Sequence, residues 1–263
     1  MRLFKSFYLK LLLLAILLAG SAVTYAKSGS ITMSVEAVAS ASAAAIGQPA
    51  TSTPATAAGG TAAASVQKTQ SVPACQPSNY SGPSAPAAVA SQPGLHQNIL
   101  APSYYTVYGN TTDQVRRQIA ACSPANSGGE RFAASTDYAL NWAFDFASGD
   151  DGLCRVTAAS VALNVSVVYP SWQPSSGAAA GLDASWRKFI TSLSAHENGH
   201  VQINQAGAAQ LLAGLQGFPA TSCDTIVAQV TAKATADIQA INQSNDRYDS
   251  NTGHGATQGA VLN

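Results

Sequence analysis

The sequence is poor in charged residues. Thirteen of its 263 residues are Lys or Arg and thirteen are Asp or Glu, so charged side chains make up 10% of the chain and the net charge is zero. Soluble domains usually carry about 25% charged residues. Binding to nucleic acid requires a basic face, and nothing in this balance indicates one. We therefore expect no nucleic-acid partner.

The chain also lacks an apolar run long enough to span a membrane comfortably. A short basic start precedes an apolar stretch at residues 11–18, and small residues follow. This layout is typical of a secretory signal peptide, and Thr24-Tyr25-Ala26 fits a cleavage site. A permanent anchor, the alternative, needs about 20 apolar residues. We predict a signal peptide at residues 1–26 and a secreted or periplasmic protein with no stable membrane anchor after cleavage.

Cysteine is scarce but present in an even number: Cys75, Cys122, Cys154 and Cys223. In an oxidising compartment four cysteines indicate two disulfides, with three possible pairings. No two of them have the close spacing of a zinc site. We expect Cys75 to form a disulfide, for instance with Cys122. The alternative is a pro-segment in which Cys75 binds the metal ion of the site described below.

Large apolar residues are nearly absent from residues 27–95, where Ala, Ser, Thr, Pro and Gly dominate. Such a stretch cannot bury enough surface to offset the entropy of ordering, which predicts a flexible spacer. Residues 96–263 remain as one domain with a core of its own.

Strand patterns fill the first half of this domain. Residues 104–108 are aromatic and β-branched, as in a strand. Apolar residues then alternate with smaller or polar ones over residues 138–146 and 161–169, which predicts an antiparallel hairpin with one buried face. Pro170 is expected to end its second strand. Between these segments, Thr111 with Gln114 resembles the capping box of a short helix.

The second half has helical periodicity. Apolar residues and a few polar ones recur at a mean step near 3.6 residues from Trp186 to Leu215, with Asp183 as a plausible cap. A second helix begins near Ser222, and we expect it to end near Asn245, where Asn and Asp accumulate, leaving a polar tail. The predicted class is α+β: an antiparallel sheet packed on the first helix, with the second helix antiparallel to it.

The first helix carries the motif His196-Glu-Asn-Gly-His200, in a chain with only four His and three Glu. A four-residue step places two imidazoles on one side of a helix, where both can bind one ion beside the intervening carboxylate. Glu197 and His200 fall on the otherwise apolar stripe and so point inward. Gly199 adds weight, because glycine within a helix is costly without a reason of packing. The alternative is a coincidental match on a solvated helix.

A third ligand must come from elsewhere. If the second helix returns antiparallel, the segment that follows it reaches the level of the motif, which makes His254 the candidate. Three histidines with a water form a known catalytic zinc arrangement. Asp249 is the rival ligand, or orients a ligand from outside. The alternative for this segment is a disordered C-terminal tail. His96 is interpreted as a solvated histidine.

These motifs together resemble a family of bacterial proteins, the predicted secreted zinc-dependent proteases, catalogued as a domain of unknown function. The specific matches are His196-Glu-Asn-Gly-His200 and Tyr248-Asp-Ser-Asn-Thr-Gly-His254-Gly. Supporting matches are Tyr105 to Thr111, the strand Thr136 to Phe144, Cys154 with the β run after it, Trp186, Phe189 and Cys223. The resemblance implies a zincin-like fold, His196, His200 and His254 on Zn²⁺, Glu197 as catalytic residue and a Cys154–Cys223 disulfide. Residues 27–95 lie outside it.

The chemistry of such a site predicts a zinc metallopeptidase in which Glu197 is the general base for attack of water on a peptide or protein substrate. The phenol of Tyr248 is a candidate for stabilising the oxyanion, or else packs the end of the second helix. Two alternatives stay open. One is a hydrolase of amide bonds in cell-wall peptides, and the other is a non-enzymatic envelope protein in which zinc is structural.

Overall fold

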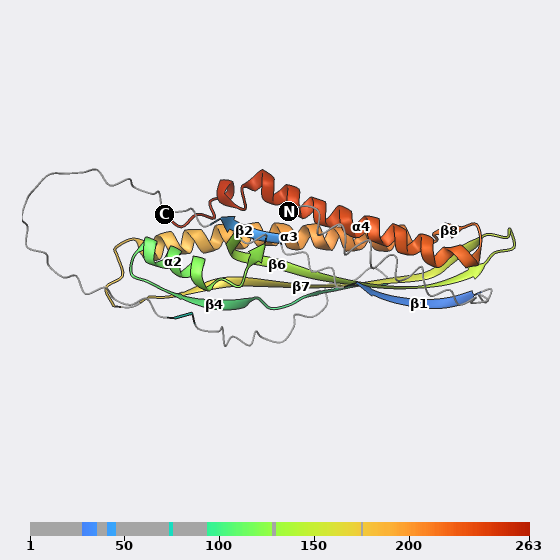
Figure 1. Cartoon of the computed structure of the whole chain (residues 1–263), viewed down its shortest axis with the longest axis horizontal. Helices are drawn as coiled ribbons and strands as arrows, with labels where there is room; N and C mark the ends of the chain where they lie inside the picture. Colours follow the sequence, from blue (N-terminus) through green and yellow to red (C-terminus); the bar gives the residue numbers. More distant parts are fainter. Residues whose placement is uncertain (1–27, 36–40, 46–73, 76–93, 128–129, 175) are drawn as a thin grey trace, which may run out of the picture.

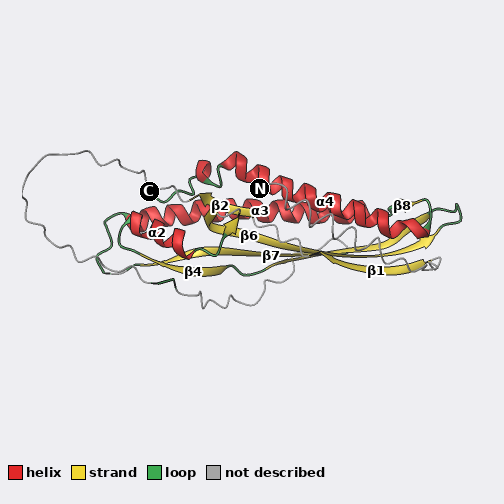
Figure 2. Ribbon diagram, in the orientation of Figure 1, coloured by secondary structure: helices red, strands yellow, loops and turns green. Residues whose placement is uncertain are grey.

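The computed structural model describes residues 28–35, 41–45, 74–75, 94–127, 130–174 and 176–263. The predicted signal peptide at residues 1–26 lies outside the described residues. The fold is arranged in layers: a long sheet, helix α3 (Leu182–Leu215) on one of its faces, and helix α4 (Cys223–Thr252) against α3 (Figure 1, Figure 2). The α+β class predicted from the sequence is confirmed.

The predicted hairpin forms the centre of the sheet. Strand β6 (Glu130–Ser148) and strand β7 (Cys154–Gln173) are antiparallel, with Leu140 opposite Leu163. Both leucines are fully buried, because the period of two turns the same face of each strand toward the helices. The hairpin thereby supplies the floor on which α3 rests.

The sheet is mixed rather than antiparallel throughout. Strands β3 (Leu95–Ile99) and β4 (Ser103–Tyr108) run parallel to β7. The expected end of β7 at Pro170 is wrong, since Pro170 lies opposite Tyr105 of β4. Pairing with β6 ends at Val168, so the proline sits where β7 has a partner on one side only, and an edge tolerates its missing N–H.

Two segments of the predicted spacer are strands. Strands β1 (Ser28–Val35) and β2 (Ala41–Ala45) pair antiparallel with the edge of β6 that β7 leaves open. The composition of residues 27–95 did not predict these strands, because an open sheet edge pairs through backbone N–H and C=O groups. Such pairing is available to a strand with small side chains as readily as to any other. Of the rest of residues 27–95, residues 74–75 and 94–95 are described, and the remainder lies outside the described residues.

The helices begin largely where the sequence indicates. Helix α2 (Thr112–Cys122) is capped by Thr111, whose Oγ1 accepts a hydrogen bond from the Gln114 N–H. Asp183 lies in the first turn of α3 and pairs with Arg187, while Gly181 takes the cap position. Short elements complete the domain: β5 (Asn126–Ser127), β8 (Pro219–Ala220) and the 3₁₀ turn η1 (Ala256–Gln258).

Helix α4 is about two turns longer than predicted. It continues past Asn245 to Thr252 and ends at Gly253, which adopts a left-handed conformation. Asn and Asp are weak helix formers because their side chains compete for backbone hydrogen bonds. Here Asn245 and Asp249 face α3 and are bonded to it, so tertiary contacts override the local preference. The extension carries Asp249 to the level of the motif on α3.

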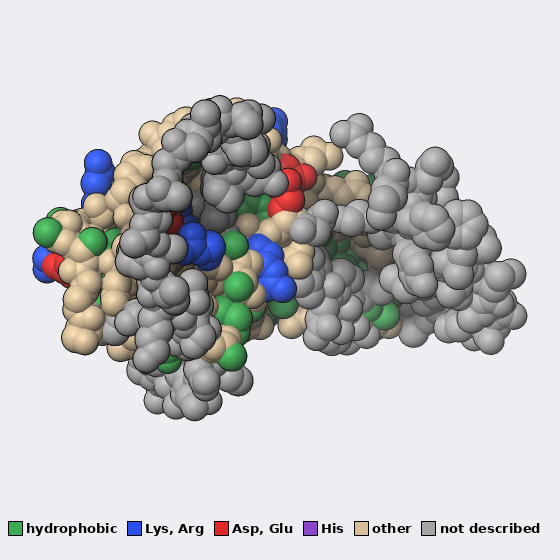
Figure 3. All heavy atoms as spheres, turned by 60° about the vertical axis from the view of Figure 1, so that its left-hand side comes forward, with side chains coloured by type: hydrophobic (Ala, Val, Ile, Leu, Met, Phe, Trp, Pro, Cys, Tyr) green, Lys and Arg blue, Asp and Glu red, His purple; other side chains and the backbone are tan. Residues whose placement is uncertain are grey.

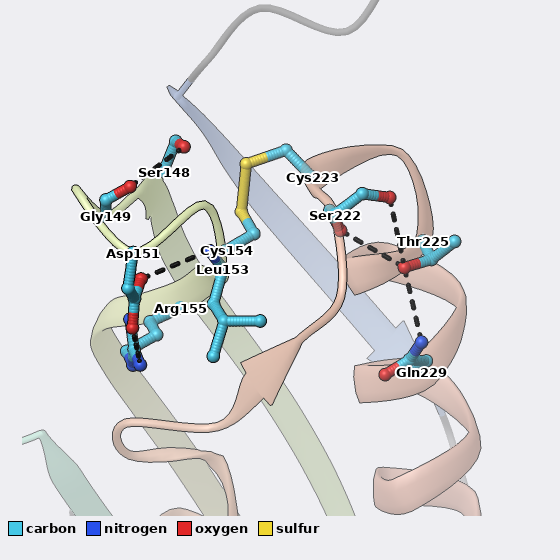
Figure 4. The surroundings of a disulfide bond; sticks show 10 residues. All are labelled: Ser148, Gly149, Asp151, Leu153, Cys154, Arg155, Ser222, Cys223, Thr225 and Gln229. Carbon is cyan, nitrogen blue, oxygen red and sulfur yellow. Dashed lines mark hydrogen bonds and ion pairs between the residues drawn. A yellow bond between two sulfur atoms is a disulfide. The ribbon is translucent and has the colours of Figure 1, made fainter.

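Two disulfides fasten the fold. Cys154–Cys223 joins the start of β7 to the first residue of α4, beside the hairpin turn (Figure 4). Cys75–Cys122 ties a residue of the N-terminal region to the end of α2. Two such bonds are consistent with an extracytoplasmic protein.

The surface has no charge of one dominant sign on the side that is drawn. Acidic and basic side chains are interspersed on the face in Figure 3. Within the described ranges, no helix combines the length and the apolar character that crossing a membrane requires.

Candidate metal centre

The two histidines of the motif on α3 point into the interface with α4. His196, Glu197 and His200 are fully buried, as the helical period predicts. The two helices pack closely two turns beyond His200, where Gly207 faces Ile241: a Cβ on Gly207 would lie 2.3 Å from Ile241. This close approach brings the last turns of α4 within bonding distance of the two histidines.

Three potential ligand atoms converge there. Asp249 Oδ1 lies 3.2 Å from His196 Nε2 and 3.0 Å from His200 Nε2, and the two Nε2 atoms are 3.2 Å apart. These three residues are the group among the described residues that can hold a metal ion. Tetrahedral zinc with bonds of about 2.0–2.1 Å would place its ligand atoms roughly 3.3 Å apart, so the donors need little rearrangement.

The outer nitrogens of both imidazoles are held by amide side chains. His196 Nδ1 lies 2.8 Å from Gln258 Oε1, and His200 Nδ1 lies 2.9 Å from Asn245 Oδ1. An amide oxygen only accepts, so each Nδ1 carries a proton, and in the neutral ring Nε2 is left with a lone pair toward the cluster. Asn245 Nδ2 in turn donates to Asn204 Oδ1 over 2.9 Å. The imidazoles are thus fixed in the tautomer that binds metal.

Neither Asn245 nor Gln258 was singled out as a site residue from the sequence. The usable signal was a polar residue on a buried stripe: Asn204 continues the spacing of α3, and Asn245 and Asp249 continue that of α4 after Ile241. Gln258, in η1, has no periodic signal because the chain reaches the site through left-handed turns at Gly253 and Gly255.

The convergence of three electron-rich atoms demands positive charge. Burial alone raises the pKa of the Asp249 carboxyl, but its hydrogen bonds with His196 and His200 outweigh burial and hold that pKa at about 2. Two imidazoles and a carboxylate suit zinc and other divalent transition metals equally in donor type. The group can therefore bind a metal ion.

Glu197 points to the sheet side of α3. Its Oε2 accepts a hydrogen bond of 2.6 Å from Thr136 Oγ1 on β6, whereas Oε1 is buried and has no hydrogen-bond partner among the described residues. Burial raises the pKa of Glu197 to about 8. The hydrogen bond from Thr136 lowers this pKa, and the negative charges of Asp249 and Asp137 raise it further. A buried acceptor without a donor is costly, so this oxygen is prepared for a group from outside the chain.

Tyr248 packs against both histidines. Its ring stacks on His196 and meets His200 edge-on, each at 4.9 Å between ring centroids. Its hydroxyl accepts a hydrogen bond from Gln258 Nε2 over 3.0 Å. These contacts are those of the packing interpretation, and a role in stabilising an oxyanion stays a prediction.

His254 lies next to the cluster but outside the group of three. Its Nδ1 is 3.6 Å from Asp249 Oδ1, its side chain is 35% exposed, and its ring packs on Phe132. Asp249, the rival third ligand, is the residue that shares the cluster with His196 and His200. His96 lies in β3 opposite Ala162 and contributes nothing to the group.

Gly199→Ala is expected to destabilise the protein. A Cβ at this position would lie 2.2 Å from the Tyr248 hydroxyl oxygen, so the ring over the histidines must move. We expect a loss of about 1–3 kcal/mol in the free energy of unfolding, the usual cost of overpacking, measured by urea denaturation. Gly214→Ala, on the same helix, is the control, because its Cβ would meet the mobile end of Lys233. Equal effects of the two changes would contradict this account.

The metal-free protein is expected to lose stability as the pH rises from about 4.5 to about 8. Over that range Glu197 is ionised in the unfolded chain, where its pKa is 4.5, but protonated in the folded one, where it is about 8. The unfolded state then binds fewer protons, so the free energy of unfolding falls by roughly 1 kcal/mol per pH unit. Glu197→Gln should remove this slope, and Glu130→Gln, at an exposed position, should retain it. Urea denaturation at four pH values measures both; parallel slopes in all three proteins would overturn the assignment.

The chain belongs to a family of bacterial proteins of unknown function (DUF922), whose model matches residues 102–255. The match covers more than half of the chain and runs from the start of β4 to just beyond His254. It includes both helices of the metal-binding group and excludes β1 and β2. No curated protein and no solved structure matches the chain significantly.

Proposed function

We propose that this protein is an extracytoplasmic zinc-dependent hydrolase that cleaves peptide bonds. In this proposal His196, His200 and Asp249 hold the zinc ion, and Glu197 is the general base. The observation that carries the proposal is the buried Oε1 of Glu197, which has no partner among the described residues although Glu197 directly follows His196 of the group that can bind metal. The two disulfides support the location outside the cytoplasm.

A purely structural metal site does not explain Glu197. Structural zinc sites are closed by four protein ligands, whereas catalytic ones hold three and leave one position for water or substrate. The group here has three members. A structural site also gains nothing from a buried carboxyl whose free oxygen lacks a donor, since burial without a partner costs stability.

Zinc, when bound, acts as a Lewis acid and lowers the pKa of a water molecule to about 7. Thr136 holds one oxygen of Glu197 and leaves the other free to accept a proton from the attacking water. Glu197 then gives that proton to the leaving amine nitrogen. A carboxyl can both take a proton from water and return it to a leaving amine. Gln258 and Asn245 keep the imidazoles oriented throughout.

Metal removal tests the proposal. The mature protein should hydrolyse casein or a mixed fluorogenic peptide library, lose this activity after treatment with a chelator, and regain it with one equivalent of zinc. Purified cell-wall sacculi form a parallel substrate, so that cleavage of sacculi alone would redirect the proposal to cell-wall peptides. Absence of metal-dependent release from all three substrates would contradict it.

A further inference from the structure

The segment Ala41–Ala45 forms strand β2, which pairs with the part of β6 that borders the metal centre. Strand β2 pairs antiparallel with β6, placing Ala41 opposite Thr136 and Ala45 opposite Phe132. In Figure 1 it runs beside the helix pair, and it lies against both α3 and α4. This position differs from that of β1, which pairs further along β6, from Leu140 to Ala147.

Both ends of the paired stretch of β6 contact residues of the centre. Thr136 donates the hydrogen bond that holds Glu197. Phe132 packs on His254, whose Nδ1 is 3.6 Å from Asp249. Four residue steps of a strand span roughly 13 Å. The backbone of β2 therefore runs along the part of β6 that carries both of these contacts.

An extended peptide would bind at this same edge. Adding a strand to an open sheet edge is a general mode of peptide recognition, in which main-chain hydrogen bonds give affinity. We propose that the edge of β6 from Phe132 to Thr136 is the peptide-binding strand of the site, and that the chain's own Ala41–Ala45 occupies it and excludes other peptides. This inference rests on the proposed function, because it assigns the substrate's position at that site.

The composition of β2 fits an occupant that holds its place without strong contacts. Its sequence, Ala-Ser-Ala-Ala-Ala, has only small side chains, so affinity comes from backbone pairing. Residues 46–74 separate Ala45 from Cys75, which is bonded to Cys122 of the domain. Because the segment belongs to the same chain as the edge, its pairing is intramolecular and competes with binding of a peptide from solution. The segment also lies outside residues 102–255, which the family model matches.

The test compares two proline variants of the mature, full-length protein. Ala43→Pro with Ala44→Pro removes two successive N–H groups from β2, so pairing fails whichever of them faces β6. Thr32→Pro with Met33→Pro does the same to β1 and is the matched control. The probe is a fluorescent synthetic peptide with the sequence of residues 38–47, and binding is measured by anisotropy on zinc-loaded protein alongside hydrolysis of the peptide library.

We expect the β2 variant to bind the probe about 10-fold more tightly than wild type, since the competing segment no longer fills the edge. Its hydrolysis of the library should rise by a similar factor, while the β1 variant resembles wild type in both assays. Equal binding of the probe by wild type and the β2 variant would overturn the inference, as would equal gains in both variants. Tighter binding by the β2 variant without any hydrolysis would support the occupied edge and reject the proposed peptidase.

Discussion

Glu197→Gln is expected to lower hydrolysis by about 10²–10⁴-fold, the range that a positioned general base contributes, while zinc binding stays within a few-fold of wild type. Glutamine keeps the shape of the side chain and retains an oxygen for the Thr136 hydroxyl, but it cannot take a proton. The carboxyl of Glu197 bonds to Thr136 rather than to the ligand group, so its loss leaves the group unchanged. The measurement is kcat/KM on the peptide library, with zinc content determined on the same samples.

Thr136→Val is the companion variant. Valine preserves the volume at a fully buried position of β6 but removes the hydroxyl that fixes Glu197. We expect a smaller loss of kcat, because the base is still present but less well oriented. Full activity in Glu197→Gln would remove Glu197 from the mechanism, and loss of zinc together with activity would make its role structural.

Replacing a ligand should have the second large effect, on metal affinity. His200→Ala and Asp249→Ala each remove one of three converging donors, so we expect zinc affinity to fall by more than about 100-fold, beyond the 10–100-fold typical of partners outside the ligand shell. Asn245→Ala, which releases His200 Nδ1, should fall within that lower range. His254→Ala should change affinity least, because His254 lies outside the group. Competition titration with a chromophoric zinc chelator measures all four variants.

The order of these effects is the informative result. If His254→Ala loses zinc and Asp249→Ala keeps it, the ligand assignment is reversed. His254 is then the third ligand, and Asp249, 3.6 Å from His254 Nδ1, is the residue that orients it. If neither change matters, the centre does not bind zinc through α4 at all.

Much of the centre could be predicted because it follows from helical geometry. The four-residue step between His196 and His200, and their place on the buried stripe of α3, need nothing beyond the period of a helix. The hairpin of β6 and β7 was equally accessible, since alternation over both strands specifies one buried face.

The remainder depends on contacts between segments distant in the chain. Asn245 and Asp249 belong to a stretch with weak helix propensity, and α4 continues through it because their side chains bond to α3. The early end predicted for that helix placed Asp249 in the tail together with His254, whereas α4 itself carries Asp249 to the level of the motif. The strands β1 and β2 were missed for a similar reason, because the edge of β6 recruits them through backbone groups that composition does not report.

The central claim is an open metal centre built by α3 and α4, and the zinc K-edge X-ray absorption spectrum of the one-to-one zinc complex tests it most directly. The account predicts a first shell of two imidazole nitrogens and oxygen ligands, without sulfur. Asp249→Ala should disturb this shell, and Glu197→Gln should leave it unchanged. A shell with three imidazoles, a sulfur ligand or no imidazole would contradict the account.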